Sequence, residues 1–374
     1  VDLVPTLRAF GRDIGVDGNY IYTAATTTDP VSKVHTHYLL AYKFNGSGYS
    51  EDGRLVVTDS WGTATNSTTR SNTGDSFFGQ VIDAEDGVVL VATSNEHPAG
   101  GSERVGATRI YKYDTISRVF NLQHYHAGSG LTSYDGAYAA TDGKFAVTAS
   151  QSANKVLSVR VNSGTTWNLL RGQSSTGNDL YSSVELKAGL LVNAGANTSS
   201  GFIGFQVWDA ATGQVQQTQS YGAVSAFRLT NGSTLDLNKS SSGGMNGSLS
   251  REGSILVLDR MGQQVGTNTG AGWVRVLKRN GNTFSAVFDE VGSAKSSNIR
   301  GIPYAEDRFV VATGLVNSTF KAYQLVGNSV QELRSFSSPA GLSFTLYQDG
   351  DSGVFAWHFG SLTSVAEQHI RVRR

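Results

Sequence analysis

Residues 71–98, SNTGDSFFGQVIDAEDGVVLVATSNEHP, carry a pattern that predicts how this chain folds. Asp86-Gly87 is a pair that favours a two-residue hairpin turn, because both central positions of such a turn need a positive φ. The apolar run from Val88 to Ala92 predicts a strand that is buried on both faces. Gly79, ahead of the hairpin, predicts a place where a neighbouring backbone comes close. The polar residues at the end of the segment predict a loop.

The same pattern recurs six more times, which indicates a repeat protein. Its turn position returns about every 56 residues. Each copy continues with a second alternating strand, a short turn rich in Gly, Asn or Asp, and a last strand, so that each unit has four short strands. The other copies lie at residues 9–25, 133–150, 176–195, 246–259, 298–314 and 343–360.

Seven four-stranded units, none of which can bury its faces alone, predict an all-β fold, a seven-bladed β-propeller made by residues 1–374 as a single domain. The last unit supplies only three strands, and the N-terminal segment VDLVPTL is expected to join it as the fourth and close the ring. The first strand of each blade is expected to line a central channel. The expected blades are approximately residues 9–57, 75–125, 132–172, 178–222, 245–290, 297–337, and 342–374 together with 1–8.

The composition argues against several classes of protein. The chain has 30 basic and 30 acidic residues, so no net charge favours a nucleic-acid partner. No apolar run approaches the ~20 residues that a membrane-spanning helix needs, so we expect no membrane insertion. The 44 glycines indicate a turn-rich β protein, and the absence of cysteine excludes disulfides and thiol chemistry.

The repeat resembles the FG-GAP repeat. The shared features are the Phe-Gly pair, the Asp-Gly turn, an apolar strand that ends in small residues, the strand IYKY at 110–113, and the turn NSGTTW at 162–167. FG-GAP repeats build the seven-bladed propeller of integrin alpha-chain headpieces and of many bacterial and viral surface proteins. The resemblance covers most of the chain and is clearest at 9–25, 71–93 and 174–195. It implies a binding scaffold for adhesion or recognition.

The resemblance also implies calcium in the turns between first and second strands, held by alternating Asp or Asn ligands. The segment DGDSG (349–353) comes nearest to that pattern, which makes Asp349 and Asp351 the candidate calcium ligands. Trp357 stands where the family has a further acidic residue, so this loop departs from the family pattern. A second candidate group consists of Asp83, Glu85 and Asp86.

Antiparallel strand order predicts which end of the blades binds a ligand. The turns between first and second strands and between third and fourth strands share one end and are short throughout. The loops between second and third strands, and the crossings between blades, share the other end and hold every long segment. We expect binding on this long-loop face, because long loops on a rigid scaffold commonly carry function. The long segments are residues 26–35, 58–74, 94–106, 223–244 and 259–272.

Two of these loops supply the predicted ligand-binding residues. Trp61 is an indole in a polar loop, which suits stacking on a sugar ring or anchoring a protein partner. The alternative is that Trp61 folds back over the rim of the propeller. The other candidates are polar and charged, and the alternative for them is an ordinary solvated loop. They are Asp59, Glu96, His97, Glu103 and Arg104.

The sequence also offers elements of catalytic chemistry. The pairs His35/His37 and His124/His126 could each give two imidazoles to a metal, but no third ligand is visible. The turn NSGTTW also resembles the Asp-box of sialidase propellers, which implies a glycosidase or lyase with its site at the channel mouth. The first-strand residues that could serve such a site are Arg12, Asp13, Tyr134, Asp135, Tyr181 and Arg300. The alternative is that these polar residues only line a water-filled channel, as the first strands of propellers commonly do. The sequence shows no complete catalytic set.

The leading hypothesis is therefore a non-enzymatic propeller for surface recognition or adhesion, which binds a glycan or a protein through its long-loop face. We expect it to be extracellular or surface-exposed, on a cell or a virion. A propeller glycosidase or lyase is the alternative, and a structural role with self-assembly through the same face is a third hypothesis.

Glycosylation sequons begin at Asn45, Asn66, Asn197, Asn231, Asn238, Asn246 and Asn317, mostly in expected loops or turns.

Overall fold

The computed structural model describes residues 2–3, 13–28, 35–57, 78–94, 106–128, 137–150, 155–175, 183–197, 202–240, 244–295, 297–313, 319–337, 344–351, 354–359 and 369–373. For residues 2–3, 26–28, 35, 155–156, 173–175, 197 and those from 344 onward, the description covers the backbone and strand pairing only. The chain divides into two compact units. The first comprises Val1–Thr176, Thr345–Asp349 and Phe355–Arg374, and the second comprises Gly177–Phe344 and Gly350–Val354.

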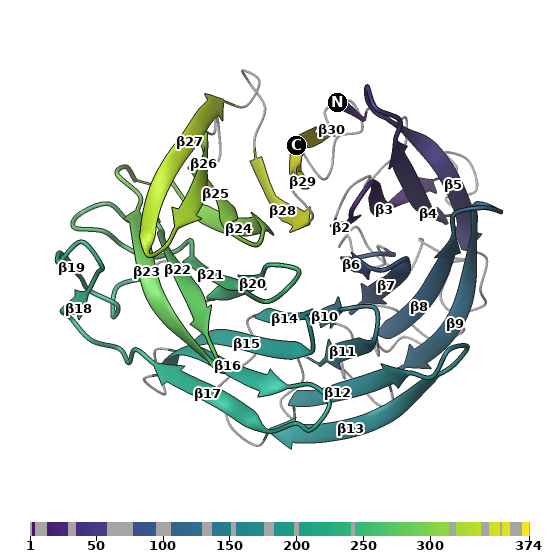
Figure 1. The fold of residues 1–374 in the computed structure, drawn as a ribbon, viewed down its shortest axis with the longest axis horizontal. Coiled ribbons are helices and arrows are strands. Elements are labelled where there is room, and N and C mark those ends of the chain that lie inside the picture. The colour runs from purple at the N-terminus through teal and green to yellow at the C-terminus, as the bar shows by residue number, and fades with distance from the viewer. Residues whose placement is uncertain are drawn as a thin grey trace. The chain divides into compact units, whose positions relative to one another are not determined.

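The first unit contains three complete four-stranded antiparallel sheets, each formed by strands consecutive in the sequence (Figure 1). One consists of β2 (Ile14–Asp17), β3 (Tyr20–Thr28), β4 (His35–Phe44) and β5 (Tyr49–Val57). The next consists of β6 (Val81–Glu85), β7 (Val88–Thr93), β8 (Ala107–Asp114) and β9 (Val119–Ala127). The third consists of β10 (Tyr138–Thr141), β11 (Phe145–Ala149), β12 (Lys155–Asn162) and β13 (Trp167–Ser175).

The second unit contains three more such sheets. One consists of β14 (Ser183–Lys187), β15 (Leu190–Asn197), β16 (Phe202–Asp209) and β17 (Val215–Ser220). The next consists of β20 (Asn246–Leu249), β21 (Ile255–Arg260), β22 (Trp273–Asn280) and β23 (Thr283–Val291). The last consists of β24 (Arg300–Ala305), β25 (Arg308–Thr313), β26 (Thr319–Val326) and β27 (Ser329–Ser337).

The seventh sheet joins the two ends of the chain. Its strand order is β1-β30-β29-β28, with β1 (Asp2–Leu3), β28 (Phe344–Asp351), β29 (Val354–Phe359) and β30 (His369–Arg373). Asp2 pairs with Arg371 and Leu3 with Ile370, so the N-terminal segment supplies the fourth strand, as predicted. Seven four-stranded antiparallel sheets built in this way are the blades of a seven-bladed β-propeller. The single-domain organisation and the expected blade limits stay predictions.

The hairpin turns have the backbone that their residues favour. Asp86 and Gly87 have φ values of 51° and 71°, as a two-residue turn with two positive φ values requires. The equivalent turn in the second unit places Ala188 at φ 51° and Gly189 at φ 71°. Alanine is strained in this conformation, because its Cβ crowds the backbone when φ is positive.

Gly79 needs its missing side chain for two reasons. It has a φ of 73°, and a Cβ at this position would overlap the Cβ of Ala24 on β3 of the neighbouring sheet. The close neighbour is therefore a side chain, whereas the sequence led us to expect a backbone. The segment 78–80 can lie against β3 only if residue 79 is glycine.

The second strands of the complete sheets are largely buried, as the apolar runs predict. Every residue of β7 and of β21 is buried, whereas the outer strands β17 and β27 contain only exposed and partly exposed residues. A strand that is covered by neighbouring sheets on both of its faces must be apolar on both. An outer strand has one face in contact with water and can carry polar side chains there. In the described residues no helix is long and apolar enough to cross a membrane.

One long segment of the predicted binding face has structure of its own. Residues 223–244, expected as a loop, contain a two-stranded sheet of β18 (Phe227–Arg228) and β19 (Thr234–Leu235). This small hairpin lies between β17 and β20 in the chain (Figure 1). The sequence of the hairpin is too short and too polar to show a strand pattern by itself.

Candidate functional site

The predicted ligand-binding residues lie outside the part of the chain that the structure describes. These residues are Trp61, Asp59, Glu96, His97, Glu103 and Arg104. Two of the predicted long segments are described almost throughout, and both belong to the second unit. We call residues 221–240 and 261–272 the loop platform. The first segment connects β17 to β20, and the second connects β21 to β22.

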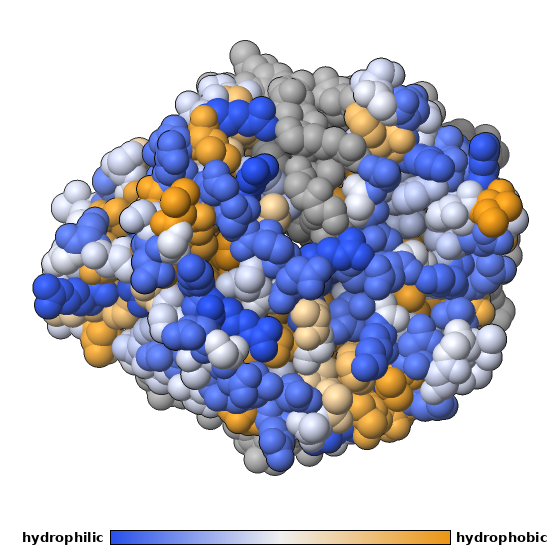
Figure 2. Space-filling model, viewed as in Figure 1, coloured by the Kyte–Doolittle hydropathy of each residue, from blue (hydrophilic) through white to orange (hydrophobic). Residues whose placement is uncertain are grey.

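The exposed surface of the loop platform consists mainly of hydroxyl, amide and cationic side chains. Such groups can donate and accept hydrogen bonds to a ligand, and none of them is a nucleophile with a neighbouring base. Figure 2 shows hydrophilic side chains beside apolar ones in the region where Figure 1 places β18 and β19. The exposed polar residues on the hairpin and beside it are Ser225, Arg228, Thr230, Asn231, Ser233, Thr234, Asn238 and Lys239.

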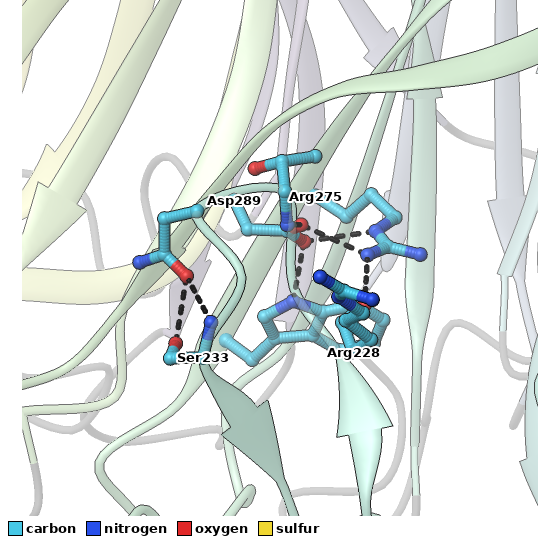
Figure 3. Close-up of polar contacts among 7 residues, drawn as sticks. Arg228, Ser233, Arg275 and Asp289 are labelled. Carbon is cyan, nitrogen blue, oxygen red and sulfur yellow. Dashed lines mark hydrogen bonds and ion pairs between the residues drawn. The ribbon is translucent and has the colours of Figure 1, made fainter.

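A buried carboxylate on β23 anchors the first segment of the platform. Asp289 accepts hydrogen bonds from Arg275 Nε and Nη2, both at 2.8 Å, and from Trp273 Nε1 at 2.9 Å. It also accepts the backbone N–H of Thr230 at 2.8 Å, which lies in the turn of the β18–β19 hairpin. Figure 3 shows this carboxylate facing the guanidinium of Arg275, with Arg228 and Ser233 of the hairpin beside them. One side chain therefore holds two blade strands and the hairpin together.

Arg275 is also enclosed by aromatic rings. Its Cζ lies 4.3 Å from the ring centroid of Phe227, 5.2 Å from that of Tyr221 and 5.4 Å from that of Trp273. Burial alone would lower the pKa of Arg275, but the hydrogen bonds and charge of Asp289 outweigh it and raise that pKa. Burial raises the pKa of Tyr221 to about 12. Both side chains thus keep their usual protonation states at neutral pH, and neither is suited to transferring a proton there.

The tip of the β18–β19 hairpin is fixed by a local turn. The amide oxygen of Asn231 accepts hydrogen bonds from the backbone N–H of Ser233 at 3.0 Å and from its hydroxyl at 2.7 Å. Gly232 between them has a φ of 84°, which only glycine adopts readily. The side chains at this tip are exposed but presented on a defined backbone.

The second segment is fastened to the first by two buried polar side chains. Arg260 and Gln263 are each 0% exposed. Arg260 Nη1 donates to the backbone oxygen of Leu237 and to Gln263 Oε1, both at 2.8 Å. Gln263 Nε2 in turn donates to the backbone oxygens of Asp236 and Lys239, both at 2.7 Å. The two segments therefore form one connected surface.

The calcium prediction has a partial counterpart in the first unit. Asp17, Glu85 and Asp86 bring carboxylate oxygens within 4.8 Å of one another, at the turns β2–β3 and β6–β7. Asp83, which we had grouped with Glu85 and Asp86, lies apart from them and accepts the backbone N–H of Thr141 at 2.6 Å. Sequence analysis missed Asp17 because it belongs to the neighbouring blade. Three carboxylates are the ligand type that calcium prefers, but calcium takes six to eight oxygens.

One carboxylate of this group also has a structural role. Asp17 Oδ2 accepts the backbone N–H of Gly87 at 2.6 Å, and Lys112 Nζ donates to the backbone oxygen of Asp86. The other calcium candidates, Asp349 and Asp351, lie near the end of β28, where the structure describes only the backbone. Both groups stay predictions as calcium sites.

The residues considered for catalysis have structural partners where the structure describes them. Asp13 Oδ2 accepts the backbone N–H of Ile82 at 2.7 Å and so joins β6 to the preceding sheet. Arg300 forms an ion pair with the buried Asp259, with 3.5 Å between Nε and Oδ2. Trp167 of the Asp-box-like turn is buried and donates its indole N–H to Gln123 Oε1 at 3.0 Å. The remaining candidates, Arg12, Tyr134, Asp135 and Tyr181, lie outside the described residues.

The two His-x-His pairs are placed differently from each other. His37 on β4 is buried against the ring of Phe78, with 6.0 Å between the ring centroids, and the side chain of His35 is not described. His124 and His126 lie on β9 and are partly exposed. Burial, together with the positive charges of Arg160 and His126, lowers the pKa of His124 to about 4. Within the described residues, neither pair belongs to a group of three potential metal ligands.

No protein-family model matches the chain, and no curated protein matches it. Among solved structures, it is similar to the β-propeller domain of the Trilobed protease from Pyrococcus furiosus, with a TM-score of 0.54 and 6% identity over 98% of this chain and 95% of that one. It is also similar to Sqt1 of Saccharomyces cerevisiae, with a TM-score of 0.45 and 8% identity over 97% of this chain and 96% of that one. At such low identity, similarity shows the fold alone.

Proposed function

We propose that this propeller is a non-enzymatic recognition protein that binds a glycan or a surface protein through its long-loop face. The observation that carries the proposal is the construction of the loop platform. Buried polar side chains, among them Asp289, Arg260 and Gln263, anchor its backbone. Its exposed side chains do not form a nucleophile–base pair. A preorganised surface of this kind loses little conformational entropy when it binds.

The exposed groups suit a polar ligand. Hydroxyl, amide and guanidinium groups such as those of Thr230, Asn231 and Arg228 can pair with sugar hydroxyls or with the polar rim of a protein interface. The resemblance to FG-GAP repeats supports adhesion or recognition at the outside of a cell or virion, and we propose that location for this chain. The loops that contain Trp61 and Glu96 belong to the same predicted face.

The test is a binding screen with the purified full chain on a broad glycan array, run with calcium and again with a chelator. The platform variants are Arg228→Ala and Lys239→Ala. These residues contact the anchoring network through their backbone oxygens, so both substitutions leave the anchor in place. We expect each variant to weaken binding of a ligand found in the screen at least about tenfold, since a charge-assisted hydrogen bond contributes roughly 1.5–3 kcal/mol.

Arg279→Ala is the matched control. Arg279 is a cation on the same blade, in the β22–β23 hairpin at the other end of the strands, and its Nε donates to the backbone oxygen of Gly281. This variant should bind as the wild type does. Binding that survives the double substitution of Arg228 and Lys239 would place the site away from the platform. An array without any bound glycan would exclude the glycan ligand and leave a protein partner or self-assembly, which analytical ultracentrifugation distinguishes.

A further inference from the structure

Three basic side chains meet at the boundary between the second and third sheets of the first unit. His124 and His126 lie on β9, Arg160 lies on β12, and all three are partly exposed. Strand pairing sets His124 opposite Ile110 and Arg160 opposite Ala146, and these two apolar residues pack together in the core between the two sheets. Residues opposite each other in paired strands share a face, as do alternate residues of one strand. All three basic side chains therefore point into the same boundary.

The outer strands on either side of this boundary are held together. Trp167 Nε1 on β13 donates a hydrogen bond to Gln123 Oε1 on β9, at 3.0 Å. Figure 1 shows β9 and β13 as the outermost strands of their sheets. Burial, followed by the positive charges of Arg160 and His126, lowers the pKa of His124 to about 4. The three basic groups are thus close enough for their charges to act on one another.

The chain supplies no acidic partner for this cluster. The strands β9, β12 and β13 contain no acidic residue. The acidic residue of β8, Asp114, uses its carboxylate to accept the backbone N–H of Ile116 and the hydroxyl of Ser117. Arg160 forms no hydrogen bond or ion pair within the described residues, and burial lowers its pKa with no acidic group to oppose the change. Its charge is therefore uncompensated in the part of the chain that the structure describes.

The other described cations of these strands do not join the cluster. Lys112 on β8 donates from Nζ to the backbone oxygen of Asp86. Strand pairing places Arg109 and Arg171 on the opposite faces of their sheets. The cluster consists of one guanidinium and two imidazoles.

The boundary is open to solvent beside Arg160. Gly172 on β13 pairs with Ser158, which lies on the same face of β12 as Arg160. Gly172 is exposed, and a Cβ built on it would meet no atom within 4 Å. A ligand from solution therefore has space next to the cluster.

We propose that His124, His126 and Arg160 bind a sulfate or phosphate group at the outer edge of this boundary. The guanidinium supplies a permanent charge, and each imidazole adds a charged N–H donor when it is protonated. A tetrahedral group can accept hydrogen bonds from donors on two strands at once, whereas one guanidinium already matches both oxygens of a carboxylate. The site belongs to the first unit and is independent of what the loop platform recognises.

The test is a pH titration of the full chain labelled with ¹⁵N-histidine and followed by NMR. It is run in sodium chloride, sodium sulfate, sodium phosphate and sodium acetate at equal ionic strength, and His124→Gln and His126→Gln assign the two resonances. We expect sulfate or phosphate to raise the pKa of both histidines by about one unit, because a nearby negative charge favours the protonated form. The rise should saturate with anion concentration, and the anion with the lower Kd identifies which of the two groups the site prefers.

Arg160→Gln should abolish the rise, because it removes the permanent charge. Lys144→Gln is the matched control, since Lys144 is an exposed cation in the β10–β11 turn of the same sheet as Arg160, and this variant should keep the rise. The proposal is overturned if neither sulfate nor phosphate raises the two pKa values in the wild type, a result that does not depend on how any variant folds. It is equally overturned if Arg160→Gln responds like the wild type, or if acetate produces the same rise at the same concentration.

Discussion

The buried carboxylate of Asp289 makes the most direct prediction about stability. Asp289→Ala removes the partner of Arg275, whose side chain is only 7% exposed, and leaves its charge buried and uncompensated. Breaking a buried ion pair in this way costs about 3–5 kcal/mol. The indole N–H of Trp273 and the backbone N–H of Thr230 lose their acceptor in the same step. We expect the free energy of unfolding to fall by about 4 kcal/mol.

The chain provides a matched control for this experiment. Arg54 and Glu51 make the same two-bond contact, also at 2.8 Å, but their side chains are 46% and 36% exposed. Glu51→Ala should cost less than about 1 kcal/mol, because water takes the place of the lost partner. The two variants therefore differ mainly in the burial of the broken pair.

The assay is urea unfolding followed by tryptophan fluorescence, together with hydrogen exchange of the platform amides. Asp289→Ala should lower the unfolding midpoint and increase exchange in residues 227–235, since the hairpin loses its anchor at Thr230. Arg275→Met combined with Asp289→Leu should recover part of the loss, because no charge is then left buried. Equal effects of Asp289→Ala and Glu51→Ala would refute the reasoning that burial of the pair sets its contribution.

Three further predictions concern single positions. Ala188→Asn should raise the free energy of unfolding by about 0.5–1 kcal/mol in urea melts, because asparagine tolerates the φ of 51° that alanine disfavours, and a loss of stability would contradict this. Gly79→Ala should cost at least 2 kcal/mol by the same assay, since its Cβ would overlap Ala24; a change below 1 kcal/mol would show that the segment shifts easily. The lowered pKa of His124, about 4, means that the folded state binds fewer protons than the unfolded state between pH 4 and 6.5. Stability should therefore fall as the pH drops through that window, by about 1–2 kcal/mol after allowing for the partial exposure of the ring, and His124→Gln should remove this part of the pH dependence. An unchanged pH profile in the variant would contradict the assignment.

Some of the candidate site could be predicted from sequence, and some could not. Loop length alone predicted a binding face at the end of the blades that contains the platform, and this stays a prediction. The sequence also pointed to Glu85 and Asp86, because they stand at a turn in one repeat. It did not identify Asp17, because proximity between turns of neighbouring blades depends on how sheets pack and leaves no trace in local spacing. Trp61 and the charged loop residues lie outside the described residues, so their role stays a prediction.

The sequence by itself determined the repeat, the four strands of each unit and the hairpin turns. These features follow from local rules: alternating or continuous apolar runs form strands, and Asp-Gly pairs adopt positive φ. It also determined that the N-terminal segment completes the last sheet, because three strands at the end left one place unfilled. Only the tertiary structure decided that residues 223–244 carry a hairpin held by Asp289, and that Arg260 has no carboxylate partner among the residues that the structure describes. The reason is that a buried charge takes its partner from any element packed against it, at whatever distance along the chain.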